Sequence, residues 1–246
     1  MSKSLIDVAI IKDGLRKNEN TVMPIHYTQT EKSLISRFNI DITKRCNPDY
    51  IGHVNYFNPL ETLKMIGNNT EEDVQKMADI IKRLAQEVCN GYGRKYVCVS
   101  IRANNPHHFF DIPRWHIDGY FFRNPKSRTK QQSKFITVLK GAGTLMIHPQ
   151  PKKEVIEKIE KLLSDLGNNN EEDQMSIKFR KKYDAILVNE NKKQLNNEQG
   201  LVFMVDNRDR VLIHSEPPMR EDRLFISILP GYEYEITELN KRWNKK

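Results

Sequence analysis

The sequence predicts an α+β protein that is mainly β, built as one barrel or sandwich with a helix before it and a helical insertion within it. Three observations predict this class. One amphipathic helix precedes residue 95, short apolar runs of strand length follow it, and a second amphipathic stretch interrupts them at 151–184. No linker rich in proline, glycine or serine divides the chain, so we expect a single domain over residues 1–246.

Residues 1–94 are expected to form a mixed, partly helical support region, in which one helix stands out. Thr70 is followed three residues later by Asp73, a spacing typical of a helix start that the threonine side chain caps. Apolar residues then recur every three or four positions and share one face: Val74, Met77, Ile80, Ile81, Leu84 and Val88. Asn90-Gly91 predicts the end of this helix, which we expect to be scaffold.

Residues 95–232 carry the predicted β core. Strands are predicted for residues 96–102, 115–122, 135–139, 143–148, 185–188, 201–205, 211–214 and 224–229. Within the insertion, the apolar residues of one helical stripe are Val155, Ile159, Leu162 and Leu166. Residues 174–182 are ambiguous between patterns. A basic C-terminal tail covers residues 233–246, and its last part, residues 241–246, is predicted to be a frayed end.

Composition and charge limit the classes of function. The chain carries 40 Lys and Arg against 32 Asp and Glu, a formal net charge of +8, and its sequence pI is about 9.2. That charge is compatible with an anionic partner such as nucleic acid without requiring one. We find no apolar run near the roughly 18 residues of a membrane span and no secretory leader, so we expect a soluble, cytoplasmic protein without a membrane partner. The three cysteines are too few and scattered for a disulfide framework, which predicts reduced thiols.

The most informative pattern is His116-Ile117-Asp118, followed much later by His214 and then Arg223. Residues two apart on a strand point to the same face, so His116 and Asp118 present their side chains together. Two histidines and one carboxylate can occupy one face of an octahedral metal, which leaves positions open as in non-haem Fe(II) oxygenases. The guanidinium of Arg223 can hold a dicarboxylate by a two-pronged contact. These residues border apolar runs, which favours a site over a chance match.

Five segments carry a family resemblance: Trp-His-Ile-Asp-Gly at 115–119, Gly-Ala-Gly-Thr-Leu-Met at 141–146, Gly-Leu-Val-Phe-Met at 200–204, Ile-His-Ser-Glu-Pro-Pro at 213–218 and Arg-Leu-Phe-Ile-Ser at 223–227. In order and spacing they resemble the double-stranded β-helix core, a jelly-roll or cupin-like barrel, of Fe(II)/2-oxoglutarate-dependent dioxygenases. The resemblance implies Fe(II) held by His116, Asp118 and His214, and 2-oxoglutarate paired with Arg223. The implied activity is hydroxylation or demethylation of a substrate with O2 and 2-oxoglutarate.

One position departs from the family pattern. Many members have a hydroxyl residue two positions after the arginine, where this chain has Phe225. We expect a neighbouring strand to supply the hydroxyl, with Thr137 as the first choice and Thr144 as the second. Alternative anchors for the co-substrate carboxylate are Arg102, Lys134 and Arg220.

Three basic residues and one asparagine are assigned to the substrate side. These predicted substrate-side residues are Arg102, Asn104, Arg128 and Lys130. The stretch 123–134 carries five basic residues and no acid, so it is interpreted either as a lid that attracts an anionic or nucleic-acid substrate or as a solvated loop.

Two other functions remain open at this point. The chain can be a non-catalytic jelly-roll binding protein with a vestigial metal site, binding an anionic partner such as nucleic acid. It can also be another metal enzyme on a cupin-like barrel, although the absence of a His-x-His pair disfavours this reading.

Overall fold

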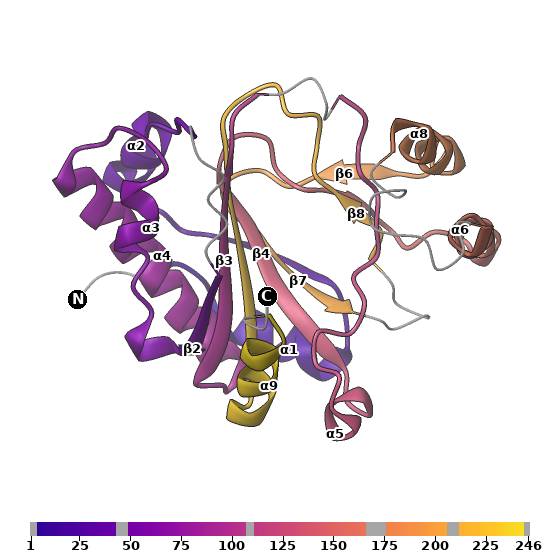
Figure 1. Cartoon of the computed structure of the whole chain (residues 1–246), viewed down its shortest axis with the longest axis horizontal. Helices are drawn as coiled ribbons and strands as arrows, with labels where there is room; N and C mark the ends of the chain where they lie inside the picture. The colour runs from indigo at the N-terminus through magenta and orange to yellow at the C-terminus, as the bar shows by residue number, and fades with distance from the viewer. Residues whose placement is uncertain (1–3, 43–48, 107–110, 166–175, 206–211, 244–246) are drawn as a thin grey trace.

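A computed structural model describes residues 4–42, 49–106, 111–165, 176–205 and 212–243. Within these residues a large antiparallel sheet has the strand order β1-β7-β4-β9-β3-β2. Its strands are β1 Thr21–Pro24, β2 Asp49–His53, β3 Tyr96–Asn104, β4 Gln132–Lys140, β7 Gln199–Val205 and β9 Arg223–Gly231. A small antiparallel sheet, ordered β6-β5-β8, contains β5 Leu145–Ile147, β6 Lys192–Gln194 and β8 His214–Ser215. Figure 1 shows the large sheet between a group of N-terminal helices and the small sheet.

Helices from the N-terminal region cover one face of the large sheet (Figure 1). They are α1 Val8–Lys17, α2 Gln29–Arg37, the 3-10 turn η1 Val54–Tyr56, α3 Leu60–Lys64 and α4 Glu71–Tyr92. The buried apolar face of α4 packs on alternate residues of the sheet, such as Val99 of β3 and Ile226 of β9. Because strand residues alternate between faces, the same strands leave their other side chains for the far side of the sheet.

Helix α4 begins as predicted and ends two residues later than predicted. The Thr70 hydroxyl accepts a hydrogen bond from the backbone N–H of Asp73 at 3.1 Å. The helix continues through Gly91, where a Cβ atom would come within 2.8 Å of the Ile11 side chain. Gly93 ends it, because its φ of 61° is the left-handed conformation that favours glycine.

The described residues of the insertion include the helices α6 Lys153–Asp165 and α8 Ile177–Ile186, which pack together through Ile159 and Phe179. The predicted strand at 185–188 is therefore wrong. The hydroxyl of Ser176 accepts from the N–H of Phe179, which starts a helix, and Leu187 still donates to helical carbonyls at its end. The sequence at 168–173 is polar, which predicts a loop, and these residues lie outside the described part of the chain.

The predicted strand at 115–122 is also absent from the described structure, apart from one isolated bridge between His116 and His214. The N–H groups of Phe121 and Phe122 donate to the side-chain oxygen of Gln132, which replaces a strand partner. A single glutamine thus turns this segment back toward β4.

The basic tail is not frayed over its described part. It forms the helix α9 Glu233–Trp243, whose Ile236 and Leu239 pack on Phe122 and Leu229. The prediction of a frayed end failed because Ile236 and Leu239, which anchor this helix, are two apolar residues among many charged ones.

Antiparallel sheets with flanking helices confirm the α+β class, although the described strands form two separate sheets. Within the described chain, no helix combines the length and apolarity needed to cross a membrane.

Candidate metal centre and cavity

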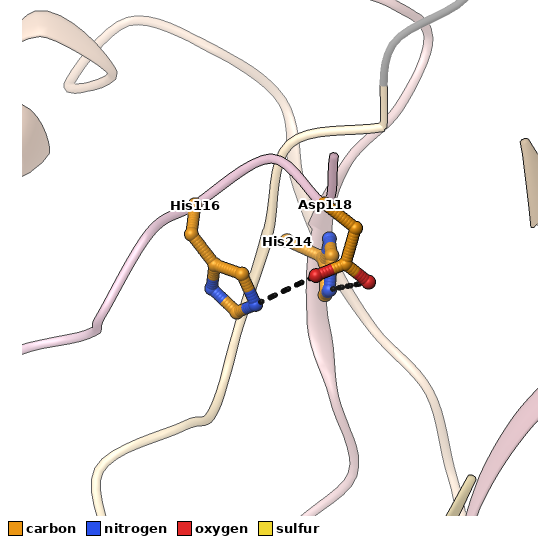
Figure 2. Close-up of side chains that lie close together, drawn as sticks. All are labelled: His116, Asp118 and His214. Atoms are coloured by element: carbon orange, nitrogen blue, oxygen red, sulfur yellow. Dashed lines mark ion pairs between the residues drawn. The ribbon is translucent and has the colours of Figure 1, made fainter. Parts of the chain in front are cut away.

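The three predicted metal ligands converge at one point (Figure 2). His116 and His214 exchange two backbone hydrogen bonds, at 2.9 and 3.1 Å, which place their side chains next to each other. Nε2 of His116 lies 3.7 Å from Oδ1 of Asp118, and Nε2 of His214 lies 3.7 Å from Oδ2. The potential ligand atoms of all three residues lie within 4.8 Å of one another.

Backbone carbonyls fix how the two imidazoles present their nitrogens. Nδ1 of His116 lies 2.9 Å from the carbonyl oxygen of Arg114, and Nδ1 of His214 lies 3.2 Å from that of Leu212. Because a carbonyl only accepts, each Nδ1 carries the hydrogen. Each Nε2 therefore offers its lone pair to the centre, as a metal ligand requires.

Burial and charge set the protonation state that a metal would meet. Burial, together with the neighbouring His116, lowers the pKa of His214 to about 3, so this imidazole is neutral at neutral pH. Burial alone would raise the pKa of Asp118, but neighbouring positive groups, Lys134 among them, hold it well below its usual range. The centre thus combines a neutral buried imidazole with an ionised carboxylate, both ready to bind a cation.

The donor set fits a divalent transition metal. Oδ2 of Asp118 is buried and forms an ion pair with the ammonium of Lys134, 2.5 Å away. Two imidazole nitrogens and a carboxylate are ligands that first-row metals such as Fe(II) accept. Lys134 comes from β4 and lies over the rings of Phe121 and Phe203, which hold it beside the carboxylate.

The centre opens into a cavity of about 580 Å³ between the two sheets. The large sheet contributes residues of β3, β4 and β9, and the small sheet contributes His214 and Ser215. The aromatic residues that line this cavity are Trp115, Phe121, Phe179, Phe225 and Trp243. A small organic molecule can therefore reach the metal ligands along a wall that is both charged and aromatic.

Arg223 lies in the wall of this cavity and is only 3% exposed. Its Nε donates to the carbonyl oxygen of Ala142 at 2.9 Å, and one terminal nitrogen donates to the Thr144 hydroxyl at 3.4 Å. Burial lowers the pKa of Arg223 to about 10, so it remains a cation at neutral pH. Arg223 and Thr144 together offer an acid group a cation and a hydroxyl.

Thr137, the first choice for that hydroxyl, is not part of the cavity wall. Lys134 and Ile136 line the cavity, so Thr137 points to the opposite face of β4. It is fully buried, and its hydroxyl donates to the carbonyl oxygen of Gln199 at 2.9 Å. The second choice, Thr144, occupies the position beside the arginine.

The four predicted substrate-side residues do not lie together in the structure. Arg102 lines the cavity, and Asn104 pairs with Arg223 across β3 and β9 without lining it. Arg128 is exposed at the end of the short helix α5 Pro125–Arg128, and Lys130 lies in a different pocket, over the ring of Tyr232. Neither borders the cavity.

The stretch 123–134 is not one solvated lid. The Ser127 side chain is fully buried and donates to Glu235 of α9 at 2.7 Å. Gln132 is also buried and donates to the carbonyl oxygen of Phe122. The segment is therefore packed at both points. Four of its cations, at positions 123, 126, 128 and 130, are exposed, and the fifth, Lys134, lies in the cavity wall.

Two features of the cavity were missed from the sequence. Arg114 and Glu216 form an ion pair at 2.8 and 3.1 Å inside it, and Trp243 reaches it from α9. Arg114 precedes His116 by two residues and Glu216 follows His214 by two, so the same two-residue spacing that identified the ligands points to this pair. No sequence signal identifies Trp243, because its place depends on how α9 docks.

No protein-family model matches the chain, and no curated protein matches it in sequence. Similar solved structures include a prolyl-4-hydroxylase from Pseudomonas putida, with 12% identity, 92% of this chain and 100% of that chain covered, and a TM-score of 0.41. A rice dioxygenase for auxin oxidation has 8% identity, coverage of 92% and 78%, and a TM-score of 0.47. A 2OG-Fe(II) oxygenase family oxidoreductase from Burkholderia pseudomallei has 10% identity, coverage of 91% and 89%, and a TM-score of 0.37. Each of these TM-scores is below 0.5, so the functional argument rests on the site.

Proposed function

We propose that this protein is an Fe(II)- and 2-oxoglutarate-dependent oxygenase that hydroxylates or demethylates its substrate. The observation that carries the proposal is the convergence of His116, Asp118 and His214 at the wall of a cavity that also contains Arg223. The large and small sheets on either side of that cavity support a double-stranded β-helix core.

The residues have distinct roles in this proposal. The two Nε2 atoms and the Asp118 carboxylate would hold Fe(II), and the backbone carbonyls that accept from each Nδ1 would orient the rings. Arg223 and Thr144 would bind the far carboxylate of 2-oxoglutarate. Lys134 would steady Asp118 through its second oxygen. When bound, Fe(II) and 2-oxoglutarate supply the oxidising chemistry, while the chain orients the substrate and excludes side reactions.

The first test is the anaerobic binding of Fe(II) and 2-oxoglutarate, followed by their weak visible charge-transfer band. We expect the band in the native protein, its loss in His116→Ala and a higher 2-oxoglutarate requirement in Arg223→Ala. Arg220→Ala is the matched control, because Arg220 is exposed and does not line the cavity. A native protein that takes up no metal and gives no band would contradict the proposal.

Turnover of 2-oxoglutarate distinguishes a catalytic site from a metal site without activity. We expect 2-oxoglutarate to be decarboxylated in air, and more rapidly once a substrate is present. Metal and 2-oxoglutarate binding without decarboxylation under any condition would favour a non-catalytic binding protein instead.

A further inference from the structure

The charged residues of the cavity are unequally paired. Among the residues that the structure describes, six Arg, Lys, Asp and Glu side chains line it: Arg102, Arg114, Lys134, Arg223, Asp118 and Glu216. Both carboxylates have a cation beside them, since Arg114 pairs with Glu216 and Lys134 with Asp118. The two arginines left over give the cavity wall an excess of positive charge.

These two arginines differ in their surroundings. Arg223 is buried and donates to Ala142 and Thr144, in the position proposed for the co-substrate. Arg102 is exposed, and no hydrogen bond or ion pair joins it to any other residue that the structure describes. An exposed residue that also lines a cavity lies where that cavity meets solvent. Arg102 is thus a free cation at the opening.

The sheet register holds both arginines on one face. Arg102 of β3 is directly opposite Phe225 of β9, two residues beyond Arg223, and both Arg102 and Phe225 line the cavity. The guanidinium of Arg223 lies 5.0 Å from the Phe225 ring. Phe225, which replaces the hydroxyl residue of the family pattern, therefore stands between a buried cation and an exposed one.

We propose that Arg102 binds an acid group of the substrate, a carboxylate or a phosphate, so that the cavity selects anions. Trp243, which is 37% exposed, and Phe121 provide flat apolar walls for the carbon skeleton of such a molecule. A guanidinium suits this role because its planar donors match both kinds of acid group. That the bound anion is a substrate rests on the proposed oxygenase function. The binding of an anion at Arg102 does not depend on that function.

The chain contains two tryptophans, Trp115 and Trp243, and both line the cavity. Their fluorescence therefore reports directly on a molecule that enters it. The probes are benzoate, phenyl phosphate, neutral benzyl alcohol and cationic benzylamine, titrated at 150 mM salt without metal or 2-oxoglutarate. We expect at least one anionic probe to bind about tenfold more tightly than benzyl alcohol, and benzylamine to bind most weakly. Benzoate and phenyl phosphate distinguish a carboxylate substrate from a phosphate substrate.

Substitution variants test whether the anion binds at Arg102 in the cavity wall. We expect Arg102→Gln to weaken the preferred anion about tenfold and to leave benzyl alcohol unchanged. Arg128→Gln, which removes an exposed cation outside the cavity, is expected to bind all probes as the native protein does. Urea unfolding checks that each variant is as stable as the native protein.

Two outcomes would overturn the proposal. Equal affinity for anionic and neutral probes would show that the cavity does not select charge. Loss of anion binding in Arg223→Gln with full binding in Arg102→Gln would place the anion at the co-substrate position instead. Because these titrations contain no metal, their failure is separate from failure of the charge-transfer test, which examines the oxygenase itself.

Discussion

The two faces of the large sheet are built from the same strands and do different things. Along β9, Leu224, Ile226 and Ile228 point toward the N-terminal helices and are fully buried in the main core. The residues between them, Arg223, Phe225 and Ser227, line the cavity. A two-residue alternation thus divides one strand into a stabilising face and a chemical face. Substitutions on neighbouring positions should therefore separate stability from binding.

The largest expected effect is on the helix-facing side. Ile226→Ala should lower the free energy of unfolding by about 2–5 kcal/mol, because it leaves a cavity in a closely packed core. Ser227→Ala, one residue along, should change it by less than about 0.5 kcal/mol. Urea denaturation of both variants checks this. Similar losses for the two would mean that the faces are not energetically distinct.

Lys134→Met tests the cavity-facing side. It removes the cation beside Asp118, so without metal we expect roughly 2 kcal/mol of destabilisation, less than for a fully buried pair. A bound divalent metal would neutralise the same carboxylate. Added Zn(II) should therefore raise the melting temperature of Lys134→Met more than that of the native protein, with Lys134→Arg behaving as native. Equal shifts in all three would argue against this role for Lys134.

Alkaline pH should weaken the buried core through two thiols. Burial raises the pKa of Cys89 and Cys98 from 9.0 to about 12, so they stay protonated in the folded state while the unfolded thiols ionise above about pH 9. The unfolded state then binds fewer protons, and the free energy of unfolding falls as pH rises, by about 1 kcal/mol per thiol at pH 10. Denaturation at pH 8 and pH 10 measures the fall. The variant carrying Cys89→Ala and Cys98→Ala should show a smaller one, and an equal fall would exclude the thiols as its cause. Cys46 lies outside the described residues.

The smallest expected effects concern two threonines, one on the helix-facing side of the large sheet and one in the cavity wall. Thr137→Val should cost about 1 kcal/mol of stability through the lost hydrogen bond to Gln199 and leave 2-oxoglutarate binding unchanged. Thr144→Val should weaken 2-oxoglutarate binding several-fold with little change in stability. Calorimetric titration of both, after metal loading, tests this. The reverse pattern would assign the co-substrate to the other hydroxyl.

The convergence of the three candidate metal ligands could be predicted because the signal is local. Two-residue spacing brings His116 and Asp118 together, and the approach of His214 needs only one bridge between two short segments. The choice between Thr137 and Thr144 could not be made from sequence. The run at 135–139 places apolar residues on both faces of β4, so alternation gives no contrast between core and cavity.

Longer-range features escaped prediction for a different reason. The segment 115–122 has strand-like composition, but the side chain of Gln132 takes its backbone donors. The run at 185–188 lies at the C-terminal end of α8. Ser176 caps the start of that helix, ten residues before Ile186. In both cases one polar side chain outweighs the apolar pattern.

The strand order of the large sheet has a consequence for how the chain assembles. β9 lies between β4 and β3, yet it comes last in sequence among the described strands of this sheet, ending at Gly231. Until that strand has been synthesised, no described strand joins β3 to β4 by hydrogen bonds. The sheet must therefore close by inserting its final strand into the middle. Contacts so distant in sequence make folding slow, and the nascent chain must keep two exposed strand edges apart while it waits.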